Sequence, residues 1–177
     1  AYWGAIIPLN NSTDTQQAGN FQSQLIGAEG AFVIAQDLST TTGSYVAANQ
    51  QQLFKVVTLD QGGDWTNRNL KVSIQDIKES TNTSNPYGTF SVVIRRLSDS
   101  DNVVEVVEQF NDCDLNPNSL NYVARKIGSQ YTTWVSDDRR YRTQGDWPNV
   151  SQFIRVEMNS DVDAGGTDAQ YLPFGFL

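Results

Sequence analysis

Histidine is absent from this 177-residue chain, and its absence excludes more chemistry than any single motif supplies. No Ser-His-Asp triad, Cys-His nucleophile pair or histidine-ligated zinc site can form within the chain. Cysteine is almost as scarce, since Cys113 stands alone and no internal disulfide is possible. Asp112 and Asp114 flank this residue, and their negative charge disfavours the thiolate that a reactive cysteine needs. We therefore expect an ordinary, half-buried thiol.

Positive charge and long apolar runs are also in short supply. The chain has 12 basic and 20 acidic residues, for a formal net charge of −8. A surface of this sign repels phosphate backbones and anionic lipid, so we expect neither nucleic acid nor membrane as a partner. No apolar run approaches the roughly 20 residues of a membrane span, and no cleavable signal peptide is visible. The two basic clusters, Arg95 with Arg96 and residues 139–142, have aspartates beside them and indicate solvated or salt-bridged edges.

What the chain does contain is a succession of short β-type segments, rich in β-branched and aromatic residues or alternating in polarity. They are residues 31–36, 53–60, 70–77, 89–97, 102–110, 131–135 and 151–158. The alternation is clearest where Leu70, Val72 and Ile74 share one face and polar residues the other. A short polar connection between 89–97 and 102–110 predicts a hairpin. Residues 10–24 are polar and predict a loop.

One segment departs from this β pattern. Four apolar residues at i, i+3, i+4 and i+7 form a helical stripe: Leu120, Val123, Ala124 and Ile127. Asn116 or Asn118 can cap the start, and Gly128 can end the helix. The predicted fold class is therefore α+β, mainly antiparallel β in a barrel or sandwich, with one short helix near residues 118–127.

Three acidic stretches have the composition of calcium-binding loops: residues 98–102, 112–116 and 161–168. Calcium needs six to eight oxygens gathered in one loop, and none of the three matches the twelve-residue, helix-flanked pattern. The stretch 161–168, DVDAGGTD, comes nearest, but Asp-Gly clusters are commoner as plain turns. We assign no metal-binding, cofactor-binding or catalytic residue.

Two further classes of function stay open on the residues alone. A carboxylate-based hydrolase needs two acids facing each other across a cleft, and 20 acids make such a pair easy to imagine without locating it. Exposed Trp and Tyr with Asn and Gln would instead suit a carbohydrate- or receptor-binding surface on a virion or cell. No spacing in the chain singles out either.

In residues 60–74, DQGGDWTNRNLKVSI, a tryptophan follows two glycines closely and lies shortly before a predicted strand. Trp65 could be displayed to a ligand, or it could fold back as a plug at the end of a sheet. A solvated indole at the lip of a concave acidic pocket would favour the first, and a buried ring the second.

Several segments together resemble one family, the tail sheath proteins of contractile-tailed bacteriophages and related contractile injection particles. The first similar feature is Gly63-x-Trp65-x-Asn67 before an alternating strand, followed by a pair of strands. Next come Leu115-x-Pro117-x-Ser119 and Asn121-Tyr122-Val123, and then Ser129-x-Tyr131 at the start of a strand. The last is LPFGF at 172–176. The similarity covers roughly residues 52–135, in the family's order. Thr66 departs from it, because the family usually has Gly after the Trp.

The resemblance implies a structural protein rather than an enzyme. Its subunits would polymerise around the tail tube and contract during genome delivery, with no metal or cofactor needed. The expected partners are other copies of the subunit and the tail tube, within a virion tail assembled in the host cytoplasm. Residues 51–177 would be the sheath-like β domain, packed as one compact module with an N-terminal segment, residues 1–50, of polar loop and one short strand.

The two ends and Trp65 complete these expectations. Both ends are apolar, AYWGAIIP and QYLPFGFL, which favours a fragment or an inserted domain that is monomeric in dilute solution. The resemblance favours the plug, with the glycine pair turning a corner and Trp65 buried against the end of the sheet.

Overall fold

The computed structural model describes residues 27–38, 45–60, 63–135 and 137–175. The strands are β1 (Glu29–Ile34), β2 (Gln52–Thr58), β3 (Leu70–Lys78), β4 (Thr89–Arg96), β5 (Val106–Cys113), β6 (Tyr131–Val135), β7 (Arg140–Gln144) and β8 (Ile154–Met158). The helical turns are η1 (Ala47–Asn49), α2 (Asp64–Asn69), α3 (Val123–Ile127) and α4 (Ser160–Asp163). The fold is α+β and mainly antiparallel β, which confirms the predicted class.

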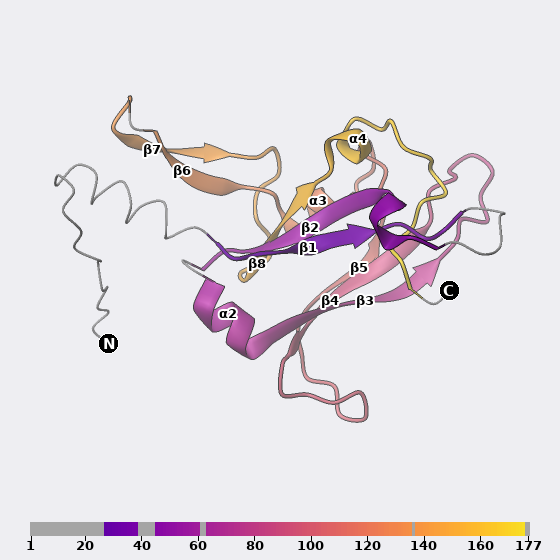
Figure 1. Ribbon diagram of the computed structural model, residues 1–177, viewed down its shortest axis with the longest axis horizontal. Coiled ribbons are helices and arrows are strands. Elements are labelled where there is room, and N and C mark those ends of the chain that lie inside the picture. The colour runs from indigo at the N-terminus through magenta and orange to yellow at the C-terminus, as the bar shows by residue number, and fades with distance from the viewer. Residues whose placement is uncertain (1–26, 39–44, 61–62, 136, 176–177) are drawn as a thin grey trace.

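Two antiparallel three-stranded sheets, β1-β2-β8 and β3-β4-β5, make up the body of the protein (Figure 1). A separate two-stranded hairpin, β6-β7, projects from one end. The two larger sheets pack on each other as a sandwich, and the rings of Phe54 on β2 and Phe90 on β4 stack between them at 6.0 Å. These two strands lie at the centres of their sheets, so they carry much of the buried apolar surface.

Every predicted strand segment overlaps an observed strand, but β5 lies further along the chain than the segment 102–110. The connection from β4 is longer than expected because it forms its own turn, in which Ser100 and Val103 exchange two backbone hydrogen bonds. Residues 10–24, predicted as loop, lie outside the described residues. Strand β7 has no counterpart in the sequence prediction.

The predicted alternation along β3 holds through Ile74 and then breaks. Asp76 has a positive φ of 51°, and the pairing of β3 with β4 shifts register between Gln75 and Lys78. This bulge moves the next apolar residue, Ile77, onto the buried side, where a strict alternation would have placed Asp76.

The predicted helix at 118–127 is wrong in its first half. Only Val123–Ile127 are helical, and Leu120 is 73% exposed instead of lying on the buried stripe. Side chains hold the preceding backbone in turns, since Asn118 N–H donates to Asn116 Oδ1 and Asn121 N–H donates to Ser119 Oγ. No side chain caps the helix, while Gly128 at its end has the expected positive φ, 114°.

The N-terminal and C-terminal parts of the described chain meet at one edge of the sandwich. β1 precedes the predicted boundary at residue 50, yet it pairs with β2, which follows it. Beyond β1, Ala35 forms an antiparallel bridge with Pro173. The last described residues therefore lie beside the first described strand.

Candidate functional site

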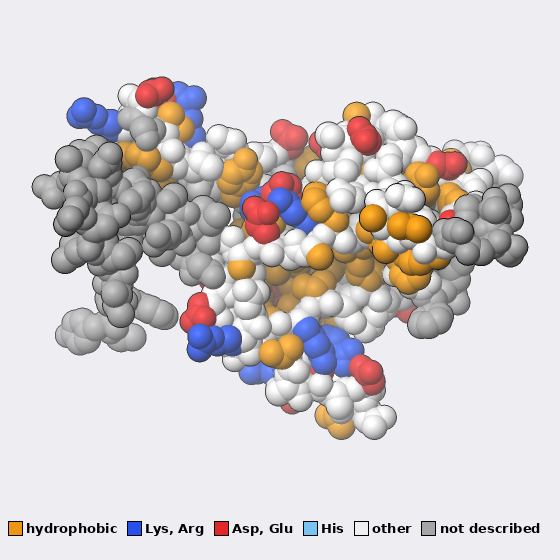
Figure 2. Space-filling view, in the orientation of Figure 1, with side chains coloured by type: hydrophobic (Ala, Val, Ile, Leu, Met, Phe, Trp, Pro, Cys, Tyr) orange, Lys and Arg blue, Asp and Glu red, His pale blue; other side chains and the backbone are white. Residues whose placement is uncertain are grey.

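An apolar groove opens between the two sheets on the face shown in Figure 2, where hydrophobic side chains line a hollow. Its volume is about 310 Å³. The apolar walls come from five strands of both sheets: Ala31 and Val33 of β1, Val56 of β2, Val72 and Ile74 of β3, Ile94 of β4 and Ile154 of β8. α2 closes one end with Thr66 and Asn67. The groove exists because β1 and β3 are edge strands of separate sheets among the described residues.

The charged side chains of this groove are already paired. Lys55 Nζ lies 2.8 Å from Glu29 Oε2, and it also lies 3.0 Å from an oxygen of Glu157. The Lys55 ammonium holds the pKa of the Glu29 carboxyl below its usual value. Lys71 Nζ lies 2.5 Å from Asp99 Oδ1. The groove is thus an apolar surface with neutralised charges, and it is not the acidic pocket that a displayed Trp65 would have required.

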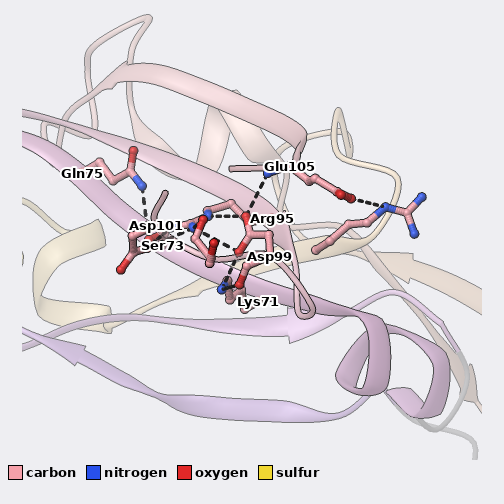
Figure 3. A network of polar contacts seen from close by, with 9 residues as sticks. Lys71, Ser73, Gln75, Arg95, Asp99, Asp101 and Glu105 are labelled. Carbon is pink, nitrogen blue, oxygen red and sulfur yellow. Dashed lines mark hydrogen bonds and ion pairs between the residues drawn. The ribbon is translucent and has the colours of Figure 1, made fainter. Parts of the chain in front are cut away.

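A buried ion-pair network lies at the base of the β4–β5 connection (Figure 3). Two guanidinium nitrogens of Arg95 donate to the two carboxylate oxygens of Asp99, at 2.8 and 3.0 Å. Asp99 also accepts from the backbone N–H of Glu105 at 2.9 Å, and Asp101 Oδ1 lies 3.0 Å from Arg95. Arg95 is only 5% exposed, and the Asp99 side chain is inaccessible.

Every charge in this network has a counter-charge or donor. Hydrogen bonds from Arg95 are the main reason that the pKa of Asp99 lies far below its usual value, and bonds from Lys71 and the Glu105 backbone act in the same direction. A carboxylate held in this way stays ionised and is a poor proton donor or acceptor. The network therefore holds the loop in shape, and the prediction that the Arg95–Arg96 cluster is salt-bridged is confirmed.

The prediction that Trp65 is a buried plug is wrong. Residues 64–69 form α2 instead of a corner, and the side chain of Trp65 is 53% exposed, stacked on Phe153 at 5.8 Å. The neighbouring Thr66 is the residue of this helix that is buried. Gly63 adopts the left-handed backbone, with a φ of 63°, whereas Thr66 is helical and does not have a positive φ, so lacking the family's glycine does not strain it.

Residues 115–123, here called the Tyr122 block, by contrast place Leu115, Tyr122 and Val123 in the interior, while Leu120 between them faces solvent. Tyr122 is 1% exposed, and its hydroxyl donates to Asp163 Oδ1 at 2.8 Å. Burial, and then this bond, raise the pKa of Tyr122. Ser119 Oγ donates to Asp114 Oδ2 at 2.6 Å, and the backbone of Asp114 bonds to residues 121 and 123. Burial raises the pKa of Asp114.

The acidic stretches weighed as calcium loops serve other purposes. In the stretch 161–168, Asp161 and Asp163 lie in α4, and Asp163 accepts the bond from Tyr122. Asp99 and Asp101, of the stretch 98–102, bind Arg95. Within the described ranges, no group of three or more His, Cys, Asp or Glu side chains could hold a metal ion.

Cys113 is fully buried rather than half-buried, with its thiol 3.4 Å from the carbonyl oxygen of Phe110. Burial is the main cause that raises the pKa of this thiol to about 11. The thiol is therefore protonated at neutral pH and sits out of reach of solvent, as a small apolar side chain would.

The β6–β7 hairpin carries exposed aromatic and basic side chains together. Trp134 and Tyr141 pair across the strands with ring centroids 5.0 Å apart, and Tyr141 is 62% exposed. Asp138 forms ion pairs with Arg140, at 3.5 Å, and with Arg142. The basic cluster at 139–142 is thus an ion-paired edge, as predicted.

Two facing carboxylates do not occur in the apolar groove or in a second hollow beside residues 79–88. Glu29 is the one acidic residue of the groove lining, and Glu79 is the one acidic residue of the second. Neither described hollow therefore has the paired acids of a sugar hydrolase. Among the described helices, none has the length and apolar character to cross a membrane.

Comparison with protein-family models, with curated proteins and with solved structures found no match to this chain. The resemblance to tail sheath proteins, drawn from short motifs, stays a prediction.

Proposed function

We propose that this chain is a structural, non-catalytic β domain of a contractile tail sheath subunit, one that packs with other copies around the tail tube of a virion. The observation that carries the proposal is the burial of the apolar and aromatic residues at the two ends of the Tyr122 block. Of the residues that carry the resemblance there, Leu115, Tyr122 and Val123 are all at most 5% exposed. Such a block serves as a framework for subunit packing and needs no reacting group.

In such an assembly the free energy for contraction is stored in the packing between subunits when the tail assembles. A module of this kind has to be rigid, and the paired charges at Arg95 and the buried bond from Tyr122 to Asp163 both support rigidity. The chain alone lacks described features that close a ring, so we expect a monomer of 19.7 kDa in dilute solution.

Electron microscopy of the tail from the particle that encodes this sequence tests the proposal. We expect one sandwich per sheath subunit, repeated with the helical symmetry of the sheath and lying outside the tube. Finding the sandwich only at a fibre tip or baseplate would reject the sheath assignment. Sedimentation of the chain alone should give the monomer, and spontaneous long tubes would reject its role as an outlying module.

A second candidate, a carbohydrate- or receptor-binding module, is favoured by the β6–β7 hairpin. Its Trp134–Tyr141 pair offers ring surface to solvent, flanked by Thr132 and Thr143 on paired positions. Aromatic faces stack on sugar rings, and hydroxyls can bond to theirs. A glycan-array signal that is lost in Trp134→Ala but retained in Trp65→Ala, an equally simple loss of an exposed indole, would favour this function over the sheath.

A further inference from the structure

The apolar groove reaches from the surface into the core of the sandwich (Figure 2). Its lining includes Phe54 of β2, Ile94 of β4 and Ile154 of β8, and all three belong to the buried core. Its lining also includes Ala31 of β1 and Val72 of β3, which are exposed. The groove is therefore a recess between the two sheets and not a flat apolar patch, and a recess of this kind suits a small molecule.

The volume of the groove sets the size of such a ligand. It is about 310 Å³, which lies at the lower end of the range for small-molecule sites. A water molecule takes up about 30 Å³ in the liquid, so the groove has room for roughly ten groups of that size. Water itself is a poor occupant, because an ordered water needs about two to four polar partners and apolar residues make up most of the lining.

The charged residues of the groove disfavour an ionic ligand. Glu29 and Lys71 are the charged residues of the lining, and each already has a partner. Lys55 Nζ lies 2.8 Å from Glu29 Oε2, and Lys71 Nζ lies 2.5 Å from Asp99 Oδ1. A charged ligand would lose its hydration without gaining a free counter-charge, so the groove favours an uncharged one.

α2 brings neutral polar groups to one end of the groove. The uncharged polar side chains of the lining are Thr58, Thr66 and Asn67, and Thr58 Oγ1 already accepts a hydrogen bond from Ala28 N–H at 2.8 Å. Thr66 and Asn67 lie at the end that α2 closes, where they can bond to a hydroxyl or amide group. We propose that the groove binds an uncharged, mainly apolar small molecule, with its apolar part between β1 and β3 and one hydroxyl or amide group at α2. The proposal does not depend on the sheath assignment.

Nuclear magnetic resonance of the isotope-labelled full chain tests the proposal with 1-nonanol, a neutral probe of about ten non-hydrogen atoms. We expect the amide signals at 29–33 and 70–74 to shift as nonanol is added, while those of β5 and of the β6–β7 hairpin stay in place. Nonanoate has the same chain but is charged at neutral pH, so it should bind at least about tenfold more weakly. Equal affinity for the two probes, or no shift up to the solubility limit of nonanol, would overturn the proposal.

A variant that fills the groove locates the site. Ala31→Trp adds a large ring at an exposed position of the lining, and we expect it to lower the affinity for nonanol at least about tenfold while the β5 signals show an intact fold. Ala47→Trp, at an exposed position of η1 outside the lining, should bind nonanol as the unchanged chain does. Undiminished binding by a folded Ala31→Trp variant would overturn the proposal. If this variant did not fold, the comparison of nonanol with nonanoate on the unchanged chain would still decide.

The response to dilution distinguishes a small molecule from a second copy of the chain as the occupant. Without nonanol, we expect the amide signals at 29–33 and 70–74 to keep their positions when the chain is diluted. Shifts of these signals on dilution, together with a dimer in sedimentation, would assign the groove to a second copy and overturn the proposal. Shifts on adding nonanol that are confined to the β6–β7 hairpin would overturn it as well, because they would place the binding at the exposed aromatic pair.

Discussion

Trp65 and Tyr122 both follow a short polar turn, but one ring lies largely in solvent while the other is closed off from it. Trp65 is 53% exposed and rests on a single ring, that of Phe153. Tyr122 is 1% exposed and has a hydrogen-bond partner 41 positions away, Asp163. The difference teaches that an aromatic residue becomes part of the framework only where distant elements supply its packing and its polar partner.

Local geometry accounts for the contrast. In α2, successive residues differ by about 100° around the helix axis, and the buried position falls on Thr66, one residue after the indole. In the Tyr122 block, the backbone of Asp114 donates to Asn121 and accepts from Val123. Those two bonds tie the block to the end of β5 and direct the Tyr122 ring inward.

Among the substitutions that test this contrast, we expect the largest loss of stability at Tyr122. Tyr122→Ala removes a buried ring and leaves Asp163 without its donor, so we expect a loss of about 4 kcal/mol in the free energy of unfolding. Urea denaturation followed by circular dichroism measures it. Leu120→Ala, two positions away but 73% exposed, should change stability by less than about 0.5 kcal/mol.

We expect the next largest loss of stability in the ion-pair network around Arg95, and we expect this loss to depend on pH. Asp99→Asn removes the bidentate, buried carboxylate from Arg95 and leaves it only the exposed Asp101 as a charge partner, so we expect the melting temperature to fall by several degrees. Glu105→Gln, at the exposed Arg96–Glu105 pair, should have almost no effect.

The pH dependence of that difference follows from the depressed pKa of Asp99. A carboxyl with a lowered folded-state pKa stabilises fully above its unfolded pKa, about 3.9, and the contribution is lost as the pH falls toward the folded value. The gap in melting temperature between the unchanged chain and Asp99→Asn should therefore be constant from pH 7 to about pH 5 and narrow below about pH 4. A gap that widens in acid would contradict this role.

Gly63 should matter more than the Trp65 that follows it. A Cβ at Gly63 would lie 2.3 Å from the Cβ of Ala28, and the residue has a positive φ, so we expect Gly63→Ala to cost about 2 kcal/mol. Gly165→Ala has a similar φ of 68° but no atom nearer than 3.8 Å, and should cost about 1 kcal/mol. If Gly63→Ala and Gly165→Ala lost equal free energy of unfolding in denaturant titrations, the close approach of residue 63 to Ala28 would have no energetic cost.

Trp65→Ala is expected to have the smallest effect, about 1 kcal/mol, because much of the ring is already in water. Trp65→Phe keeps a ring against Phe153 and should be nearly neutral. A loss of about 3 kcal/mol in the free energy of unfolding of Trp65→Ala would instead indicate that Trp65 is a buried plug, and it would contradict the contrast with Tyr122.

The sequence predicts the strands of the sandwich well because their signal is local. Segments such as 53–60 and 89–97 are rich in β-branched residues, and they correspond to the central strands β2 and β4. Sequence patterns do not predict elements that have a weak local pattern or that depend on tertiary contacts. α2, DWTNRN, has no apolar periodicity, and every residue of β7 is exposed, so its strand structure depends on pairing with β6.

The candidate site was the harder part to predict. The groove depends on which strands end up at the edges of separate sheets, and no local pattern encodes that arrangement. The charge clusters were predictable as salt bridges from adjacent opposite charges. The burial of Arg95 and Asp99 was not, because it arises from the fold of the β4–β5 connection over them.

Hydroxyl-radical footprinting of the folded chain, read by mass spectrometry, tests the contrast between the two rings most directly. Trp65 should be oxidised rapidly, and Tyr141, 62% exposed, gives the rate for an accessible tyrosine in the same sample. The account predicts that Tyr122 is oxidised at least about tenfold more slowly than Tyr141 until the chain is unfolded. Oxidation of Tyr122 as fast as that of Tyr141, or protection of Trp65 as complete as that of Tyr122, would contradict it.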